Sequence, residues 1–520
     1  MSNESPAGEG TRRGAIAIAA AKAWFLVAGL AQNVLLPLAI GQAGFGAYRR
    51  ALAFVNVLNN VIVVASIQAV SRAVAAAPPT RRRATMARAT AIQALIGLGF
   101  GTLFFAATPL IVAHQHAPQL AAPLRMLAGV LVAYGIYASL VGSLNGVRAF
   151  GAQAALDATY STTRTTLSIV FGWWFLHRLE SEGALGATVG FLTAAVAIVP
   201  LAWLLSRRVR DASGPLAEEH AFDARAHVAF LVGLLAMQGF QSLLLQVDLM
   251  VLGRAATLRA LSQGLSEPMA RASADRLAGL YAQAQSFGLV PYQLLVAAGF
   301  VLFPTVAAAR ARGDHEAVRA GVARGGAATL IVAGALVAAI GGSPMAVLRF
   351  AFGRGSADGL PLEHAAPILR MLAVAHGATA IATLGATLVA ASGRGRLAAG
   401  MSASVACCAV GGAAIGATRG DTVLSLGLAI AIGLAVGIAI GATLAALVVD
   451  RVVGPYVRPL AALRVGVAVV AALAVGALVP VPAARLLAPF VSLVPLVVFL
   501  LTVSVLGEDV RALLRPARRA

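Results

Sequence analysis

The sequence predicts an all-α, polytopic membrane protein of about fourteen transmembrane helices. Of its 520 residues, 59% are hydrophobic and only 12% are charged, and the mean hydropathy is +0.86. A soluble domain is about a quarter charged. Apolar stretches of about 18 residues or more recur along the whole chain, and each can cross about 30 Å of hydrocarbon as a helix. We therefore expect the chain to lie in a bilayer.

Glycine, proline and arginine residues separate these apolar stretches and so delimit the expected spans. The first span is a retained helix, because its apolar stretch is too long for the hydrophobic region of a cleaved signal peptide. The spans are expected at residues 15–40, 51–77, 89–113, 125–147, 154–176, 184–206, 228–253, 279–307, 325–350, 365–391, 398–418, 422–449, 464–483 and 488–507.

The arginine distribution predicts the orientation of the chain. An even number of spans puts both termini on one side, and about twice as many arginines fall on that side as on the other, which makes it cytoplasmic. The clusters Arg81–Arg83 and Arg207–Arg210 contribute most. Anionic membrane lipids are an alternative reason for such clusters. The net charge of +20 does not indicate a nucleic-acid partner, because the cations occupy short loops and form no basic domain.

A weak internal repeat suggests two six-helix lobes. Gly46-Ala-Tyr48 opens the second span and Gly279-Leu-Tyr281 opens the eighth, as expected of a transporter built from two halves. The predicted division is an N-terminal lobe at 1–210, a cytoplasmic linker at 211–226, a C-terminal lobe at 227–450, and two extra spans with a basic tail at 451–520. Residues 254–278 are expected to form an outside loop with an interfacial amphipathic helix.

Polar side chains inside the expected spans are the candidate binding groups. A charge at bilayer depth costs about 2.5 to 3.5 kcal/mol on insertion scales, so it requires a partner or a wet cavity. We expect the cations to line a cavity between the lobes with the amides, and Asp248 and Asp157 to couple transport to an ion. The expected substrate-binding residues are Lys22, Arg72, Arg164, Asn33, Asn56, Asn59, Gln241 and Gln283.

Structural explanations compete with this interpretation. Arg72 and Asp157 lie near span ends, where a long side chain reaches the interface and a charge is tolerated. Asp157 and Arg164 are two helical turns apart, so they either line one surface or neutralise each other. Any single amide is better explained as a hydrogen bond between helices.

Several apparent motifs carry no chemistry in this context. Gly97-Leu-Gly99-Phe-Gly101 lies inside an apolar helix and is no dinucleotide site, while glycines at 433, 437 and 441 indicate close helix packing. His114, His116 and His376 lack metal-ligand spacing, and Cys407 and Cys408 are adjacent packing residues. No catalytic motif or P-loop is present, so we expect neither an enzyme nor a cofactor or metal.

Four segments resemble a known family. They are Gly44–Tyr48 after span one, Asp248–Gly253 in span seven, Gly279–Ala284, and Val301–Pro304 in span eight. Together they resemble the polysaccharide-type flippases of the MOP superfamily, which move lipid-linked oligosaccharides such as O-antigen and exopolysaccharide units. The resemblance covers roughly residues 15 to 450.

The resemblance implies a V-shaped bundle of two lobes that works by alternating access in a bacterial inner membrane. It also implies an undecaprenyl-pyrophosphate-linked glycan as cargo, with a polysaccharide polymerase or glycosyltransferases as partners. The lipid II flippases and the drug or cation exporters of the same superfamily are alternatives. A membrane glycosyltransferase or ligase would need Glu267 or Asp275 of the 254–278 loop as a catalytic group, and a non-transporting scaffold would need no cavity.

Overall fold

Helices form the structure throughout the part of the chain that is described. The computed structural model describes residues 6–180, 182–207, 222–296, 306, 309–310, 312–353, 355, 359–482 and 484–507, and no β-strand occurs among them. An all-helical chain is the expected solution in a bilayer, because a helix satisfies its backbone hydrogen bonds within one segment. The chain divides into two compact units, Met1–Ser242 and Leu243–Ala520.

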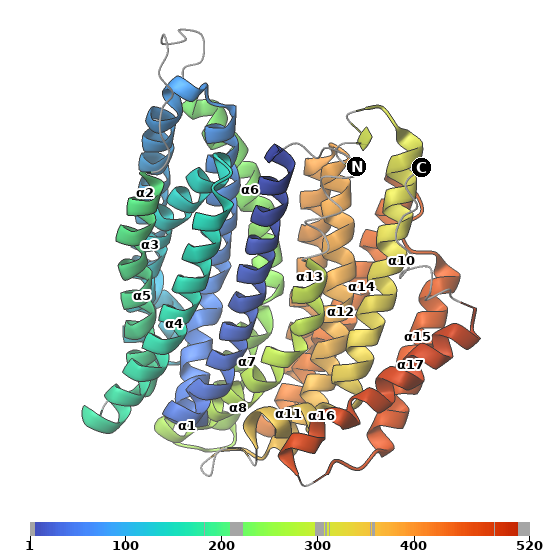
Figure 1. The fold of residues 1–520 in the computed structure, drawn as a ribbon. Helices are drawn as coiled ribbons and strands as arrows, with labels where there is room; N and C mark the ends of the chain where they lie inside the picture. The colour runs from blue at the N-terminus through green and yellow to red at the C-terminus, as the bar shows by residue number, and fades with distance from the viewer. Residues whose placement is uncertain are drawn as a thin grey trace. The chain divides into compact units, whose positions relative to one another are not determined.

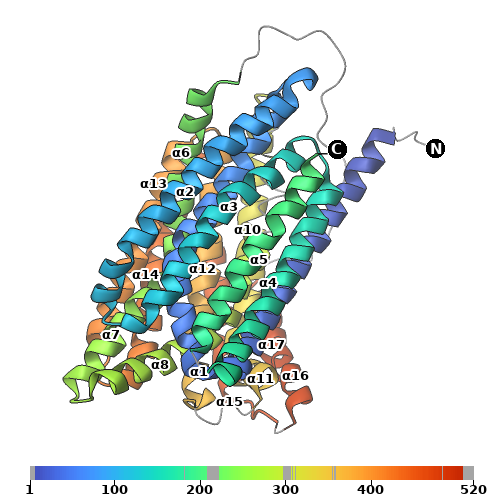
Figure 2. The ribbon, with the colours of Figure 1, turned by 90° about the vertical axis from the view of Figure 1, so that its left-hand side faces the viewer.

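Six helices make up the first unit. Figure 2 shows four of them, α2 to α5, running side by side. The helix bounds are α1 Pro6–Ala76, α2 Arg82–Gln115, α3 Ala121–Gly146, α4 Phe150–Arg178, α5 Gly183–Ser206 and α6 Ala224–Leu244, whose last two residues lie past the unit boundary.

A single glycine folds α1 into a hairpin. Gly41 has φ 73° and ψ 168°, a backbone conformation outside the helical region that glycine adopts without steric cost. The two arms, 6–40 and 42–76, return along each other (Figure 1), and they are the expected spans one and two. The segment Gly44–Tyr48, which was expected to connect these two spans, is instead helical, and Phe45 and Tyr48 are buried.

The second unit contains ten described helices. Proline in the first turn begins α8, α11 and α15, where its missing N–H costs no hydrogen bond. The bounds are α7 Val247–Ser262, α8 Glu267–Gly288, α10 His315–Gly342, α11 Pro344–Phe352, α12 Ala365–Ala391, α13 Gly395–Arg419, α14 Val423–Val452, α15 Pro459–Leu478, α16 Ala488–Val491 and α17 Leu493–Val505.

Eleven described segments are long and apolar enough to cross a membrane. They account for twelve of the fourteen expected spans, because the segment Ala20–Ala76 contains both arms of α1. The expected fifth span is α4, 29 residues long but lowered in hydropathy by Asp157, Arg164 and the Ser and Thr residues between them. The expected eighth span, 279–307, includes residues outside the described part of the chain, among them the Val301–Pro304 motif.

The segment 254–278 does not form the predicted outside loop. It belongs to α7 and α8, which are joined by a four-residue turn at 263–266 and bury Ala256, Ala260, Ala270 and Ala274. Alanine at these positions lets the two helices pack together, whereas the alternating charges suggested a surface helix.

The boundary between the units also differs from the predicted linker, much of which (208–221) lies outside the described residues. Contacts group α6 with the first unit, where Leu231 packs against Ala65 and Ala69 of α1. The seventh expected span is consequently interrupted: α6 ends at Leu244 and α7 begins at Val247.

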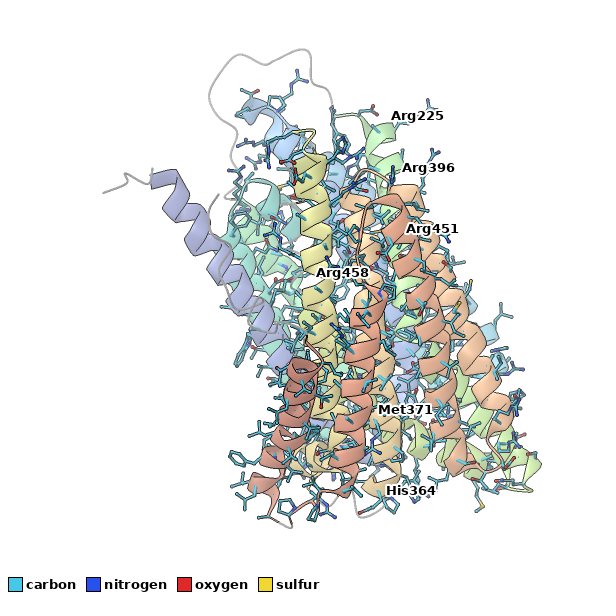
Figure 3. The ribbon with its side chains drawn as sticks, turned by 90° about the vertical axis from the view of Figure 1, so that its right-hand side faces the viewer. Arg225, His364, Met371, Arg396, Arg451 and Arg458 are labelled. Carbon is cyan, nitrogen blue, oxygen red and sulfur yellow. The ribbon has the colours of Figure 1, made fainter. Side chains whose placement is uncertain are left out.

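Glycines bring α13 and α14 into close contact, as the sequence predicts. A Cβ on Gly412 would stand 2.1 Å from the carbonyl oxygen of Gly433, and one on Gly437 would stand 2.2 Å from that of Cys408. At one end of this unit lie Arg396 and Arg451, and His364 lies at the other (Figure 3).

Candidate functional site

An ion pair joins two membrane helices of the first unit. The Lys22 Nζ of α1 lies 2.8 Å from the Asp157 Oδ2 of α4. The carboxylate side chain is 11% exposed, whereas the lysine side chain is 53% exposed. Asp157 is therefore neither at a helix end reaching the interface nor paired with Arg164: its counter-ion is Lys22. The charge of this predicted cation is balanced by a carboxylate.

Arg164 lies two turns farther along α4, against aromatic rings. Its guanidinium carbon is 4.4 Å from the centre of the Phe191 ring of α5. The Arg164 Nε is buried and has no hydrogen-bond partner among the described residues. Arg164 is half-buried, and its unpartnered Nε–H can still donate a hydrogen bond to an anion or a polar ligand.

Three tyrosines surround this part of the first unit. The hydroxyl groups of Tyr134 on α3 and Tyr160 on α4 contact each other, and the Tyr137 ring lies 5.5 Å from the Tyr160 ring. Asn59 of α1 hydrogen-bonds the Tyr134 hydroxyl, and its own Oδ1 is buried without a partner. Cation, carboxylate, hydroxyl and amide groups thus meet between α1, α3 and α4 inside one unit.

Other predicted amides lie along the α1 hairpin. Across the Gly41 turn, Arg49 donates to the Asn33 Oδ1 at 3.2 Å, and Gln32 donates to the Tyr48 hydroxyl at 3.0 Å. Asn56 is half-buried on the second arm. These bonds fix the register of the two arms, so Asn33 has a structural role whether or not it also binds a ligand.

Arg72 does not belong to this cluster. Lys22 stands 19 residues before Gly41 and Arg72 stands 31 residues after it, so at about 1.5 Å per residue Arg72 lies about 18 Å farther along the hairpin. Its guanidinium carbon is 4.3 Å from the Phe230 ring centre of α6. Gln241, the other predicted residue on α6, is half-buried near the end of the first unit.

The second unit holds a buried carboxylate of its own. Asp248 is 1% exposed at the start of α7. It accepts hydrogen bonds from the Tyr281 hydroxyl at 3.1 Å and from the Gln285 Nε2 at 2.8 Å, both on α8. Gln283, the predicted ligand on α8, is 2% exposed. These two donors stabilise the ionised form of the buried carboxylate.

The two units repeat one arrangement, which gives the sequence repeat a physical basis. In the first unit, the hydroxyl of buried Tyr48 accepts a hydrogen bond from Gln32 on the preceding arm of α1. In the second unit, the hydroxyl of buried Tyr281 donates to Asp248 on the preceding helix, α7. The tyrosine hydroxyls are polar groups that the expected binding residues did not include. Their scarcity was the available signal, because the chain has only seven tyrosines and four of the five discussed here fall within expected spans.

The two carboxylates named for the enzyme alternative, Glu267 and Asp275, both lie on α8. Glu267 pairs with Arg271 one turn later on α8, and Asp275 is buried in the same helix. No group of three or more His, Cys, Asp or Glu residues that could hold a metal ion occurs in the described part of the chain. His376 is fully buried in α12, and neither ring nitrogen has a partner among the described residues.

Comparisons with known proteins agree on one fold. The structure of the lipid II flippase MurJ in an inward closed conformation matches with a TM-score of 0.70 at 16% identity, covering 96% of this chain and 100% of MurJ. A multidrug resistance MATE transporter of the MOP superfamily, inward-facing, matches with a TM-score of 0.63 at 14% identity, covering 82% of this chain and 94% of the transporter.

A MOP superfamily transporter from Pyrococcus furiosus, for which reverse polarity of the binding pocket suggests a different function, matches with a TM-score of 0.56 at 16% identity, covering 85% and 95% of the two chains. None of the curated proteins matches the sequence. The model of one family, described as polysaccharide biosynthesis protein, matches residues 11–309, more than half of the chain. The chain therefore belongs to the polysaccharide biosynthesis protein family and has the fold of the MOP superfamily transporters.

Proposed function

We propose that this protein is an alternating-access transporter that flips a polyprenyl-pyrophosphate-linked oligosaccharide across the bacterial inner membrane. The observation that carries the proposal is the polar cluster at Lys22, Asp157 and Arg164 in a chain of the polysaccharide biosynthesis family. A pyrophosphate head needs cations and donors, while its polyprenyl tail can remain in lipid. Helices built only to pack in a bilayer would not bury these groups.

Arg164 is the strongest cargo contact in this proposal, because its Nε is buried and unpartnered. Lys22 contributes only as its contact with Asp157 loosens, since the pair is neutral as a whole. Asn33, Asn56, Asn59, Gln241 and Gln283 would bond sugar hydroxyls. Arg72 is left out of this set because of its distance along the hairpin. That the groups of both units face one cavity remains a prediction.

The membrane potential supplies a driving force in this proposal. With the inside negative, carrying one negative charge outward releases about 2.3 kcal/mol per 100 mV. Asp248 is the proposed coupling residue, because a buried carboxylate held by the Tyr281 hydroxyl and the Gln285 amide can take up a proton or a sodium ion. Asp157 is the second coupling candidate, and it must exchange Lys22 for the ion. Full gradient dependence in an Asp248→Asn variant would exclude Asp248 from this role.

One observation favours lipid II as the alternative cargo. The match to MurJ covers 96% of this chain, whereas the matches to two MATE transporters cover 82% and 86%, so the likeness to MurJ extends over more of the chain. The carboxylates Asp157 and Asp248 are the features that a cation exporter would share.

Depletion of the protein in its host distinguishes these functions. We expect a lipid-linked glycan to accumulate on the cytoplasmic leaflet, and its sugar composition to identify the cargo. Arg164→Gln should reproduce the accumulation. Arg125→Gln is the matched control, because Arg125 also lies over a ring, Phe105 at 5.8 Å, but is exposed on α3. Normal glycan distribution after depletion, or equal effects of the two variants, would contradict the proposal.

A further inference from the structure

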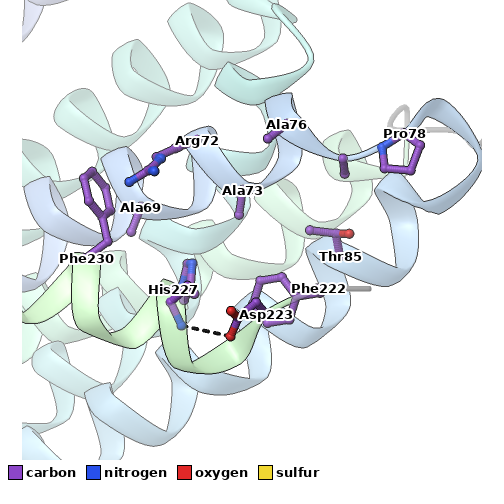
Figure 4. Close-up of a pocket in the computed structure, with 12 residues that line it drawn as sticks. Ala69, Arg72, Ala73, Ala76, Pro78, Thr85, Phe222, Asp223, His227 and Phe230 are labelled. Carbon is purple, nitrogen blue, oxygen red and sulfur yellow. Dashed lines mark hydrogen bonds between the residues drawn. The ribbon is translucent and has the colours of Figure 1, made fainter. Parts of the chain in front are cut away.

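A cavity of about 230 Å³ lies within the first unit at the far end of the α1 hairpin. The last turns of α1, the start of α2 and the first turns of α6 line it (Figure 4). Arg72 stands 31 residues beyond Gly41, or about 46 Å of helix, which exceeds the roughly 30 Å of hydrocarbon. With the Gly41 turn at one membrane surface, this length places the pocket at the other surface, at the depth of the lipid headgroups.

Two opposite charges line this pocket. Arg72 stacks over the Phe230 ring and forms no ion pair with a described carboxylate. Asp223 lies near Phe222 in the same pocket (Figure 4). Its Oδ1 accepts the Ala226 backbone N–H at 2.9 Å, and its Oδ2 accepts no hydrogen bond from a described residue. The pocket thus offers one guanidinium and one carboxylate that do not neutralise each other by direct contact.

A third polar group, His227, has a tautomer that can be assigned from its neighbours. Ser66 donates to the Gln93 Oε1 at 2.8 Å, which fixes the orientation of that amide. The Gln93 Nε2 then points its hydrogens toward the His227 Nε2, 3.5 Å away. A neutral imidazole that accepts at Nε2 carries its proton on Nδ1. His227 therefore has a second donor available in the pocket that it lines.

The remaining walls are apolar. They comprise the rings of Phe222 and Phe230, the methyl groups of Ala69, Ala73, Ala76, Ala77 and Ala226, and Pro78; Thr85 adds one hydroxyl-bearing side chain to the lining. Such walls suit a small headgroup and the first carbons of a glyceride better than a hydrated inorganic ion.

We propose that this pocket binds the phosphoethanolamine headgroup of a membrane phospholipid. The phosphate would lie at Arg72 and the His227 Nδ1–H, and the ammonium at Asp223. A purely anionic headgroup would place its charge in a pocket that also contains Asp223, whereas the zwitterion satisfies both charges. A choline headgroup has no N–H to donate to the carboxylate. The site does not depend on which cargo the protein moves.

Native mass spectrometry of the purified protein with added lipids tests the proposal. We expect phosphatidylethanolamine to be retained in preference to phosphatidylglycerol and phosphatidylcholine at equal concentrations. Arg72→Gln should weaken that retention about 10-fold, the loss of one charge-assisted contact. Asp223→Asn should shift the preference toward phosphatidylglycerol, and it keeps the α6 helix because Asn is also a good helix-capping residue.

Arg207→Gln is the matched control, because Arg207 is likewise a cation over a ring, 3.7 Å from the Trp203 ring centre, but lines no part of this pocket. Free O-phosphoethanolamine should compete with the lipid, and inorganic phosphate should compete less well. Equal retention of the three lipids by the unmodified protein overturns the proposal. So does an Asp223→Asn variant with an unchanged lipid order, even if Arg72→Gln unfolds.

Discussion

Replacing the members of the Lys22–Asp157 pair one at a time should give unequal losses of stability. Lys22→Met keeps the length of the side chain and removes its charge, leaving a carboxylate that is 11% exposed without its cation. Asp157→Asn removes the other charge but keeps an oxygen that can accept the lysine hydrogen bond. The ammonium, 53% exposed, can also turn outward. The first substitution should therefore cost more.

The structure sets the scale of this difference. Leaving a buried polar or charged group unpaired costs about 1 to 3 kcal/mol or more, which is the range we expect for Lys22→Met. An exposed ion pair contributes about 0.2 to 1 kcal/mol to the free energy of unfolding. Because the lysine is half-exposed, we expect Asp157→Asn to lower the free energy of unfolding by about 1 kcal/mol or less. The double variant should be less unstable than the two single losses added together, because both act on one contact.

Unfolding in mixed micelles titrated with sodium dodecyl sulfate, followed by tryptophan fluorescence and circular dichroism, measures these differences. Trp24 donates to the Thr162 hydroxyl at 2.9 Å, so its fluorescence reports on the same α1–α4 contact. If Asp157→Asn destabilised the protein as much as Lys22→Met, the argument from unequal burial would be refuted.

Three further predictions concern other parts of the fold. Gly412→Ala should destabilise the protein by about 1 to 3 kcal/mol because its Cβ would meet the backbone of α14, whereas Gly411→Ala, with open space around it, should be neutral or slightly stabilising in a melting assay. Asp248→Asn should lower the unfolding free energy by about 1 to 3 kcal/mol, because the variant loses charge-assisted hydrogen bonds, including the one from Gln285. The same variant should abolish the ion dependence of the flipping rate in proteoliposomes. Tyr456→Phe should lower the unfolding free energy by about 1 kcal/mol in the same assay, because the Tyr456 hydroxyl donates to the Ile381 carbonyl at 2.7 Å. Burial raises the pKa of Tyr456, so the hydroxyl remains a donor below about pH 10 and its contribution to stability is lost only above that pH.

Equal effects of the two neighbouring glycine variants would contradict the close approach of α13 and α14. A stable Asp248→Asn protein with unchanged ion dependence would show that this carboxylate is neither a structural anchor nor a coupling site. A Tyr456→Phe loss that varies between pH 6 and 9 would contradict the assignment of a neutral donor.

The sequence alone determined the class of the protein and most of its helices. Hydropathy decides whether a segment enters a bilayer, and each span forms its own backbone hydrogen bonds, so the expected spans and the helices agree without knowledge of tertiary contacts. The glycine ridge at 433, 437 and 441 was readable for the same reason, because a spacing of four places glycines on one face of a helix.

Only the tertiary structure decided the partners of the polar groups. Lys22 and Asp157 are 135 residues apart in the sequence, and no local pattern indicates that they form an ion pair. Nor does any local pattern indicate that Arg164 packs against the Phe191 ring instead. The same holds for Asp248 with Tyr281, and for the separation of Arg72 from the other cations. The charged segment 254–278 was mistaken for a loop because its alanines bury against neighbouring helices. Contacts between distant helices depend on how the whole faces of those helices pack together, and residue spacing within one segment does not determine that packing.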